Sequence, residues 1–329
     1  MSIIGIKGVN NQCYIYPYAR MRERIGGSKV ISTVAHLKKG DTVGIVCLSS
    51  LVEPEKLGNA LAFLDELGLR YKIGDTITAK HDYLAGSDDV RLGDFHAMVQ
   101  DPDVKAIFCV KGGYGSARIA GKIDYELLAE NPKIFWGFSD LTYLHCAINE
   151  YANIVTFHGP MLMAANNMDE LSKKMFLQLF SPIEIQYTEA ISPLTVVTPG
   201  FARGPIIGGN LRRIVSTLGT KFEVRTEGRI LLIEDIAETI PRIDSMLQQL
   251  KQARKLEQLA GVVIGSFTET GASDEALLVL MQEYFGDLEI PVVAGFKIGH
   301  ETTNIAIPLG VDAILDAQEK VLRILPGVY

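Results

Sequence analysis

The sequence predicts an α/β protein in which an N-terminal, doubly wound, mostly parallel sheet is followed by a smaller C-terminal α/β domain. Short apolar runs of strand length alternate with stretches of helical spacing, which is typical of a parallel sheet covered on both faces. The chain has 329 residues, more than most single domains contain. The alternation also breaks once, near residue 181, and then resumes. These three observations favour two domains.

The elements follow in order. In the first half, apolar runs predict strands at 42–48, 105–111, 134–138 and 154–158, and helical spacing predicts helices at 55–67, 88–99, 117–129 and 141–151. Residues 181–204 carry three prolines and no helical period, so they are predicted to be a connection. In the second half we expect strands at 229–235, 261–267, 291–296 and 313–324, with helices at 241–256 and 274–284. The predicted organisation is an extension of unassigned role at 1–35, a first domain at 36–180, a connection at 181–205 and a second domain at 206–329.

Composition excludes several classes of function. The net charge of -7 argues against a nucleic-acid partner, which requires a basic face. No apolar segment reaches the roughly 20 residues of a membrane span, and the N-terminus lacks the pattern of a secretory signal. The four cysteines form no CxxC pair, so we expect no metal and interpret them as reduced thiols in a cytoplasmic protein.

A serine stands where a predicted strand turns sharply into a predicted helix. The run 134–138 leads directly into Ser139 and Asp140, and helical spacing starts at once. Such a turn presents the serine hydroxyl above the sheet edge, and the Asp140 amide points where an oxyanion would form. The other interpretation is that Ser139 only caps the helix. The motif also departs from GxSxG, because Leu141 replaces the second glycine.

A glycine-rich turn, KGGYGSAR at 111–118, follows the predicted strand 105–111. It lacks the GKS or GKT ending of a phosphate loop and the third glycine of the dinucleotide fingerprint, so no cofactor is expected. The glycines would let the backbone approach a ligand or would supply an oxyanion-hole amide. A tight turn without a ligand is the alternative.

Two further residues complete a possible triad. Glu234 and Asp235 end the predicted strand 229–235, where ligand-facing side chains gather in α/β sheets. The two acids could instead form a helix-start or solvated pair. His300 lies in a polar loop after the strand 291–296, and His158 at the end of another strand is its rival as the base. Nucleophile, carboxylate and imidazole are the groups that serine acyl transfer requires.

Taken together, these motifs resemble those of the LD-carboxypeptidase family, which includes muramoyltetrapeptide carboxypeptidases and microcin C self-immunity peptidases. The blocks that carry the resemblance cover nearly everything after residue 34: GDTVGIVCLSS (40–50), GSDDVRLGDF (86–95), KGGYGSARI (111–119), PKIFWGFSDLTYLH (132–145), TFHGPM (156–161), IIGGNLRRIVSTLGT (206–220), LLIEDI (231–236) and GHETTNIAIPLG (299–310).

The resemblance implies a catalytic triad of Ser139, Glu234 and His300, split between the two domains. It implies an oxyanion hole made by the amides of Asp140 and Gly113, and a homodimer. A carboxypeptidase also needs a group that binds the substrate carboxylate; Arg118 and Arg203 are the candidates.

The substrate stays open between two branches of the family. The resemblance favours a murein tetrapeptide, cut between the L-centre of a diamino acid and a terminal D-alanine. The self-immunity branch hydrolyses an acyl-adenylate mimic and uses an aromatic side chain in a longer loop between the domains. Here that connection is short, the only tryptophan is Trp136, and Tyr187 or Phe201 would have to substitute. A non-catalytic nucleotide-binding module is the alternative from another class.

Overall fold

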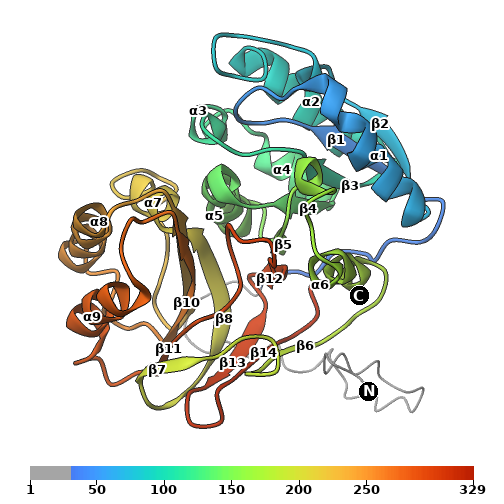
Figure 1. Ribbon diagram of the computed structural model, residues 1–329. Coiled ribbons are helices and arrows are strands. Elements are labelled where there is room, and N and C mark those ends of the chain that lie inside the picture. Colours follow the sequence, from blue (N-terminus) through green and yellow to red (C-terminus); the bar gives the residue numbers. More distant parts are fainter. Residues whose placement is uncertain (1–30) are drawn as a thin grey trace, which may run out of the picture.

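The computed structural model describes residues 31–329, so most of the predicted N-terminal extension, and Cys13 with it, lies outside the described residues. Within that range the chain is a mixed α/β protein built on two sheets, as predicted from the sequence (Figure 1).

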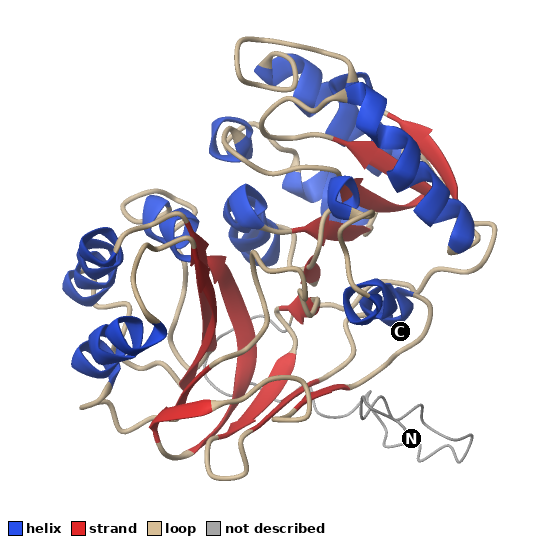
Figure 2. Ribbon diagram, viewed as in Figure 1, coloured by secondary structure: helices blue, strands red, loops and turns tan. Residues whose placement is uncertain are grey.

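The first sheet has six strands in the order β12-β5-β4-β3-β1-β2. Its parallel strands are β1 (Thr42–Val46), β2 (Arg70–Ile73), β3 (Val104–Cys109), β4 (Ile134–Gly137) and β5 (Thr156–His158), and β12 (Ile307–Leu309) pairs antiparallel with β5. Helices cover both faces (Figure 2): α1 (Leu57–Glu66), α2 (Asp88–Gln100), α3 (Ser116–Ala120), α4 (Tyr125–Glu130), α5 (Thr142–Tyr151) and α6 (Glu170–Lys174). Short 3-10 turns η1–η5 lie at Pro54–Lys56, Asp75–Ile77, Ser139–Leu141, Leu162–Ala164 and Met175–Leu179.

The strand order of this sheet locates a binding crevice. The chain winds outward from β1 in both directions, to β2 on one side and to β3, β4 and β5 on the other. In doubly wound sheets ligands bind at the carboxyl ends of the strands where the winding direction reverses. The glycine turn follows β3 and Ser139 follows β4, so both lie at this edge.

The second sheet has eight strands in the order β6-β14-β13-β8-β9-β10-β11-β7. Their bounds are β6 (Ile185–Tyr187), β7 (Thr195–Thr198), β8 (Phe201–Asn210), β9 (Ile230–Ile236), β10 (Gly261–Thr268), β11 (Val292–Ala294), β13 (Asp312–Asp316) and β14 (Val321–Ile324). The strands β8 to β11 are parallel and the outer ones antiparallel. Helices α7 (Leu211–Ser216), α8 (Ile240–Gln252) and α9 (Asp274–Phe285) cover one face (Figure 2).

Strand alternation in β9 explains how Glu234 reaches the other domain. Leu231 and Ile233 pack in the apolar cluster under α7, α8 and α9, whereas Leu232 belongs to the large core that extends into the first domain. Successive side chains of a strand point to opposite faces. Glu234 therefore lies on the same face as Leu232, toward the first sheet.

Several predicted elements differ from the structure. The segment predicted as a connection contains β6 and β7, which form the two edges of the second sheet. Prolines are tolerated in edge positions, so Pro193 and Pro199 flank β7 without breaking it. The predicted helix 117–129 is two helices, because the chain turns at Gly121 and the Asp124 side chain caps a new start by accepting from the Leu127 amide. The predicted strand 313–324 is the hairpin β13–β14.

Cys47, Cys109 and Cys146 are free thiols. Burial raises the pKa of Cys47 to about 11, which leaves a poor nucleophile. None of the helices between residues 31 and 329 is long and apolar enough to cross a membrane.

Candidate active site

Ser139 lies in a strained turn between β4 and α5. Its φ of 63° is in the left-handed region, which a residue with a side chain seldom adopts. Strain of this kind is characteristic of a nucleophile raised above a sheet edge. The close neighbour is Gly112 of the glycine turn, where an added Cβ would lie 3.2 Å from the Ser139 Oγ. Glycine at this position therefore leaves room beside the hydroxyl.

Two backbone amides near this hydroxyl have no assigned acceptor. Among the hydrogen bonds of the described residues, none uses the amide of Asp140 or that of Gly113 as donor. Free, fixed amides next to a nucleophile are the groups that bind an oxyanion. The glycine turn is held in place by the buried Arg91, whose guanidinium donates to the carbonyl of Leu48 (2.7 Å) and to that of Gly115 (2.8 Å).

Glu234 and His300 form a buried pair in the second half of the chain. The His300 Nδ1 lies 2.7 Å from the Glu234 Oε2. Because an ionised carboxylate only accepts, Nδ1 carries the proton, and Nε2 is left free to take one. The Glu234 side chain is fully buried and that of His300 is 14% exposed. Gly299 makes this approach possible, since a Cβ there would lie 2.7 Å from Glu234 Oε2.

The pair shifts the proton affinity of both groups. Burial lowers the pKa of His300, but the charge of Glu234 and the hydrogen bond to it outweigh burial, and the pKa of His300 is raised above 6.5. Complete burial raises the pKa of Glu234, and His300 opposes that rise. Glu234 therefore stabilises the charged form of His300, which is the form that a base takes once it has accepted a proton.

The domains bring this pair next to the serine turn. The ring of Phe138, the residue before Ser139, lies 4.6 Å from the His300 ring, centroid to centroid. Between the described side chains of Ser139 and His300 no hydrogen bond forms. Hydrogen bonds between nucleophile and base are often long until substrate binds.

His158, the rival base, has a different environment. It is completely buried in β5, its ring packs 5.5 Å from that of Phe138, and neither of its nitrogens has a hydrogen-bond partner among the described residues. Burial, with the nearby His145 and His300, holds the pKa of His158 well below 6.5. The carboxylate pairs with His300 and not with His158, which favours His300 as the base.

A clasp of hydrogen bonds fixes the loop that carries His300. The Oδ1 of the buried Asn304 accepts from the Gly299 amide (3.1 Å), and the Asn304 amide donates to Ser172 Oγ of α6 (2.8 Å). Ser172 Oγ also donates to the Thr302 carbonyl (3.3 Å). The loop is thus tied to α6 as well as to Glu234.

The two arginines predicted as carboxylate ligands are placed differently. Arg118 follows the glycine turn, and its Nε lies 2.9 Å from Asp88 Oδ1 with the side chain 51% exposed. Arg203 pairs with Asp312 in the first half of β8, whereas Asn210, opposite Glu234, ends that strand. The structure does not bring Arg203 together with Ser139, Glu234 or His300.

The sequence analysis assigned no role to Asn304, Arg213 and the pair Gly208–Gly209, although all four lie in blocks that carry the family resemblance. A Cβ at Gly209 would lie 2.7 Å from Thr142 Oγ1, so the glycines let β8 approach the start of α5 closely. The sequence Gly-Gly-Asn at 208–210, which ends β8, was a usable signal, because glycine inside a strand often marks close backbone approach.

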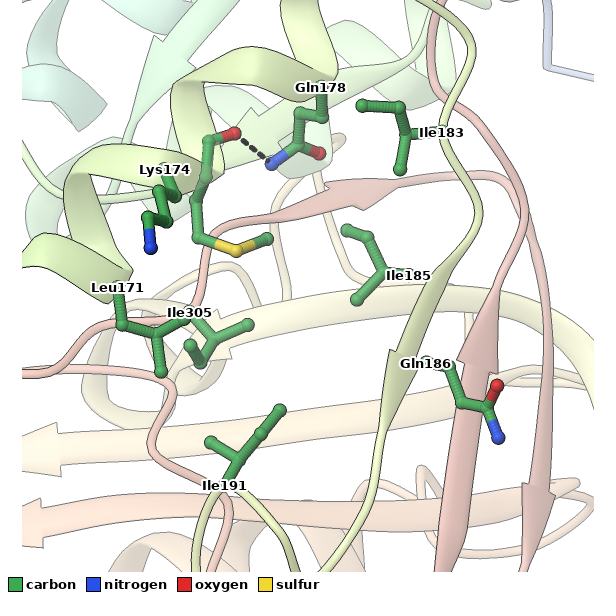
Figure 3. Close-up of a pocket in the computed structure, with 9 residues that line it drawn as sticks. Leu171, Lys174, Gln178, Ile183, Ile185, Gln186, Ile191 and Ile305 are labelled. Carbon is green, nitrogen blue, oxygen red and sulfur yellow. Dashed lines mark hydrogen bonds between the residues drawn. The ribbon is translucent and has the colours of Figure 1, made fainter. Parts of the chain in front are cut away.

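Figure 3 shows a separate apolar hollow, lined by Leu171, Ile185, Ile191 and Ile305 among others. It contains none of Ser139, Glu234 and His300, and the Gln178 Nε2 in its lining donates to the Met175 carbonyl at 2.8 Å (Figure 3). It is not the candidate site.

Comparisons with known proteins identify the family of the chain. Residues 43–159 match the LD-carboxypeptidase N-terminal domain and residues 203–315 the LD-carboxypeptidase C-terminal domain. A probable murein peptide carboxypeptidase of Bacillus subtilis is 46% identical over 302 residues, covering 89% of this chain and 94% of the relative.

Two solved structures share the architecture. An MccF-like protein from Bacillus anthracis has a TM-score of 0.82 and 27% identity, covering 89% of this chain and 99% of that one. A muramoyltetrapeptide carboxypeptidase from Oxalobacter formigenes has a TM-score of 0.76 and 25% identity, covering 88% and 99%.

Fold, site and relatives together define a serine-type peptidase, a hydrolase. The chain belongs to the LD-carboxypeptidase family, since both domains of that family match it in order.

Proposed function

We propose that this protein is an LD-carboxypeptidase that removes the terminal D-alanine from murein tetrapeptides, cutting after the L-centre of the diamino acid. The observation that carries the proposal is the buried Glu234–His300 pair beside the strained Ser139 turn. The murein substrate is supported by the relatives, of which one is described as a probable murein peptide carboxypeptidase and another as a muramoyltetrapeptide carboxypeptidase.

In the proposed mechanism Ser139 Oγ attacks the carbonyl carbon of the scissile amide, and His300 Nε2 takes the hydroxyl proton. Glu234 holds the Nδ1 proton of His300 and stabilises the imidazolium that forms. The amides of Asp140 and Gly113 bind the oxyanion of the tetrahedral intermediate. Collapse of that intermediate breaks the C–N bond, and His300 returns the proton to the amine of D-alanine. Water then hydrolyses the acyl-enzyme through the same sequence of proton transfers.

The self-immunity branch receives less support from the aromatic side chains. Trp136 is buried in β4 and donates to the Pro160 carbonyl (2.8 Å), and Tyr187 is 1% exposed. Phe201 is exposed, but it starts β8 at the end remote from Asn210. None of these three is available for stacking on a nucleobase at the proposed site.

The decisive experiment measures D-alanine release from a murein tetrapeptide by the wild type and by Ser139→Ala, with Ser245→Ala, an exposed serine of α8, as the matched control. We expect loss of about a thousandfold or more in a folded Ser139→Ala and no loss in the control. A tetrapeptide ending in L-alanine should not be cleaved.

Other results would redirect the proposal. Cleavage of an aminoacyl-sulfamoyl-adenosine but not of the tetrapeptide would keep the triad and change the branch. Full activity of Ser139→Ala would refute the nucleophile. The family resemblance also leads us to propose a homodimer, which sedimentation would test, and a cytoplasmic location, which cell fractionation would test. We propose further that Arg118 binds the substrate carboxylate, in which case Arg118→Gln should raise KM.

A further inference from the structure

We propose that Arg213 of the second domain is a positioning residue for the oxyanion hole, which neutralises the Asp140 carboxylate and fixes the glycine turn. The inference rests on the proposed function and adds to it a residue from α7 that lies outside the triad.

Arg213 contacts both residues whose amides would form the hole. Its Nε lies 3.1 Å from Asp140 Oδ1, an ion pair that lacks the directed geometry of a hydrogen bond, and its Nη2 lies 3.5 Å from the Gly113 carbonyl, a long hydrogen bond. Its guanidinium carbon also lies 4.8 Å above the ring centroid of the neighbouring Tyr114. One side chain thus contacts the serine turn and the glycine turn together.

The charge of Asp140 explains why such a contact is needed. Its carboxylate is fully buried, and Oδ2 accepts from Ser49 Oγ (2.7 Å) and from the Ser116 amide (2.9 Å). These bonds orient the residue whose amide follows the nucleophile. A buried negative charge in the same residue would also repel a developing oxyanion, because charges interact strongly where water is excluded. Arg213, whose side chain is 15% exposed, supplies the opposite charge.

The position of Arg213 in the chain adds a link between domains. Arg213 lies in the first turn of α7, and the Asn210 side chain that caps this helix also donates to Asp235, the residue after Glu234. The helix α7, which carries Arg213, is therefore tied to β9, the strand that carries Glu234. Correct docking of the second domain would align the hole and the base at once.

The test uses a fluorophosphonate probe on the full chain. Ser139 Oγ attacks phosphorus, fluoride leaves, His300 takes the hydroxyl proton, and a phosphonyl oxygen of the adduct occupies the oxyanion hole. We expect Arg213→Gln to slow labelling and to lower kcat for the tetrapeptide by about 10- to 100-fold, with KM changed less than threefold, because the loss falls on the transition state. The labelling rate and kcat of Arg213→Lys should lie between those of the wild type and those of Arg213→Gln.

A charge-removing second substitution separates positioning from folding. Asp140→Asn keeps an acceptor for Ser49 and Ser116 but removes the charge, so Asp140→Asn/Arg213→Gln should label faster than Arg213→Gln alone. Arg225→Gln is the matched control, since Arg225 makes another ion pair between the domains, with Glu150 at 2.7 Å. It should label like the wild type.

The inference is overturned if Arg213→Gln labels within twofold of the wild type, if Arg225→Gln loses as much, or if the double variant regains nothing. A wild type that the probe labels no faster than Ser139→Ala would instead refute the proposed function itself. Thermal denaturation of each variant checks that the fold is retained.

Discussion

Replacing Glu234 by glutamine should change both the rate and the pH profile, and the direction of each change follows from the pair with His300. Glutamine has the size of glutamate but no charge. In the wild type, Glu234 raises the pKa of His300 against the effect of burial. Without that charge, burial dominates and lowers the pKa of His300 below 6.5.

The sign of the pH effect follows from the proposed role of His300 as the base. A base works only when neutral, so activity is lost as the pH falls through its pKa. In the wild type the pKa of His300 lies above 6.5, so kcat/KM should fall as the pH drops through that pKa. Glu234→Gln should keep its residual activity to lower pH. The maximal rate should fall by about 10⁴-fold, the effect known for removing the charge of a triad acid.

The assay is D-alanine release from the tetrapeptide between pH 5 and 9, fitted for the acid limb. A variant whose acid limb stays at the wild-type pH would refute the reasoning, because it would mean that Glu234 does not control the proton affinity of the base. Loss of folding is checked by thermal denaturation at each pH.

Two further substitutions test the geometry. Gly112→Ala should fold but lose activity about 100-fold or more, because its Cβ would lie 3.2 Å from the Ser139 hydroxyl where substrate must approach; Gly58→Ala in α1, with nothing within 4 Å of the added Cβ, is the control, and an active Gly112→Ala would contradict the placement of the site. Asn304→Ala should lower the free energy of unfolding by about 1–3 kcal/mol, because the buried Gly299 amide loses its acceptor. The same variant should lower kcat, since Gly299 precedes His300; unchanged kcat together with lowered stability would make the clasp structural only.

The fold class could be predicted because strand and helix signals in the first half are local. The runs 42–48 and 134–138 are apolar and continuous, and both correspond to buried parallel strands, β1 and β4. By contrast, β6, β7 and β12 are three or four residues long, and they are strands only because distant partners offer free edges. No local pattern could identify them, since their pairing is a property of the assembled sheet.

The candidate site divides in the same way. Ser139 follows an apolar strand and Glu234 lies near the end of another, so their positions made them candidates, but only the family resemblance assigned them roles. Arg213 and Asn304 lie in blocks that carry the family resemblance, but no local pattern shows their role, which depends on partners at Asp140 and Gly299. Arg213 and Asp140 are 73 positions apart in the sequence, whereas Asn304 and Gly299 lie in one loop. The sequence alone does not show that either pair is in contact.

The return of β12 to the first sheet has a consequence for how the protein is made. During synthesis the first domain emerges with its β5 edge uncovered, because the strand that pairs with it, β12, comes only at residues 307–309. The loop that carries His300 immediately precedes β12, so the proposed base emerges together with that closing strand. A nascent chain would therefore expose Ser139 long before the proposed base, and the proposed hydrolysis could begin only after residues 300–309 have emerged and paired.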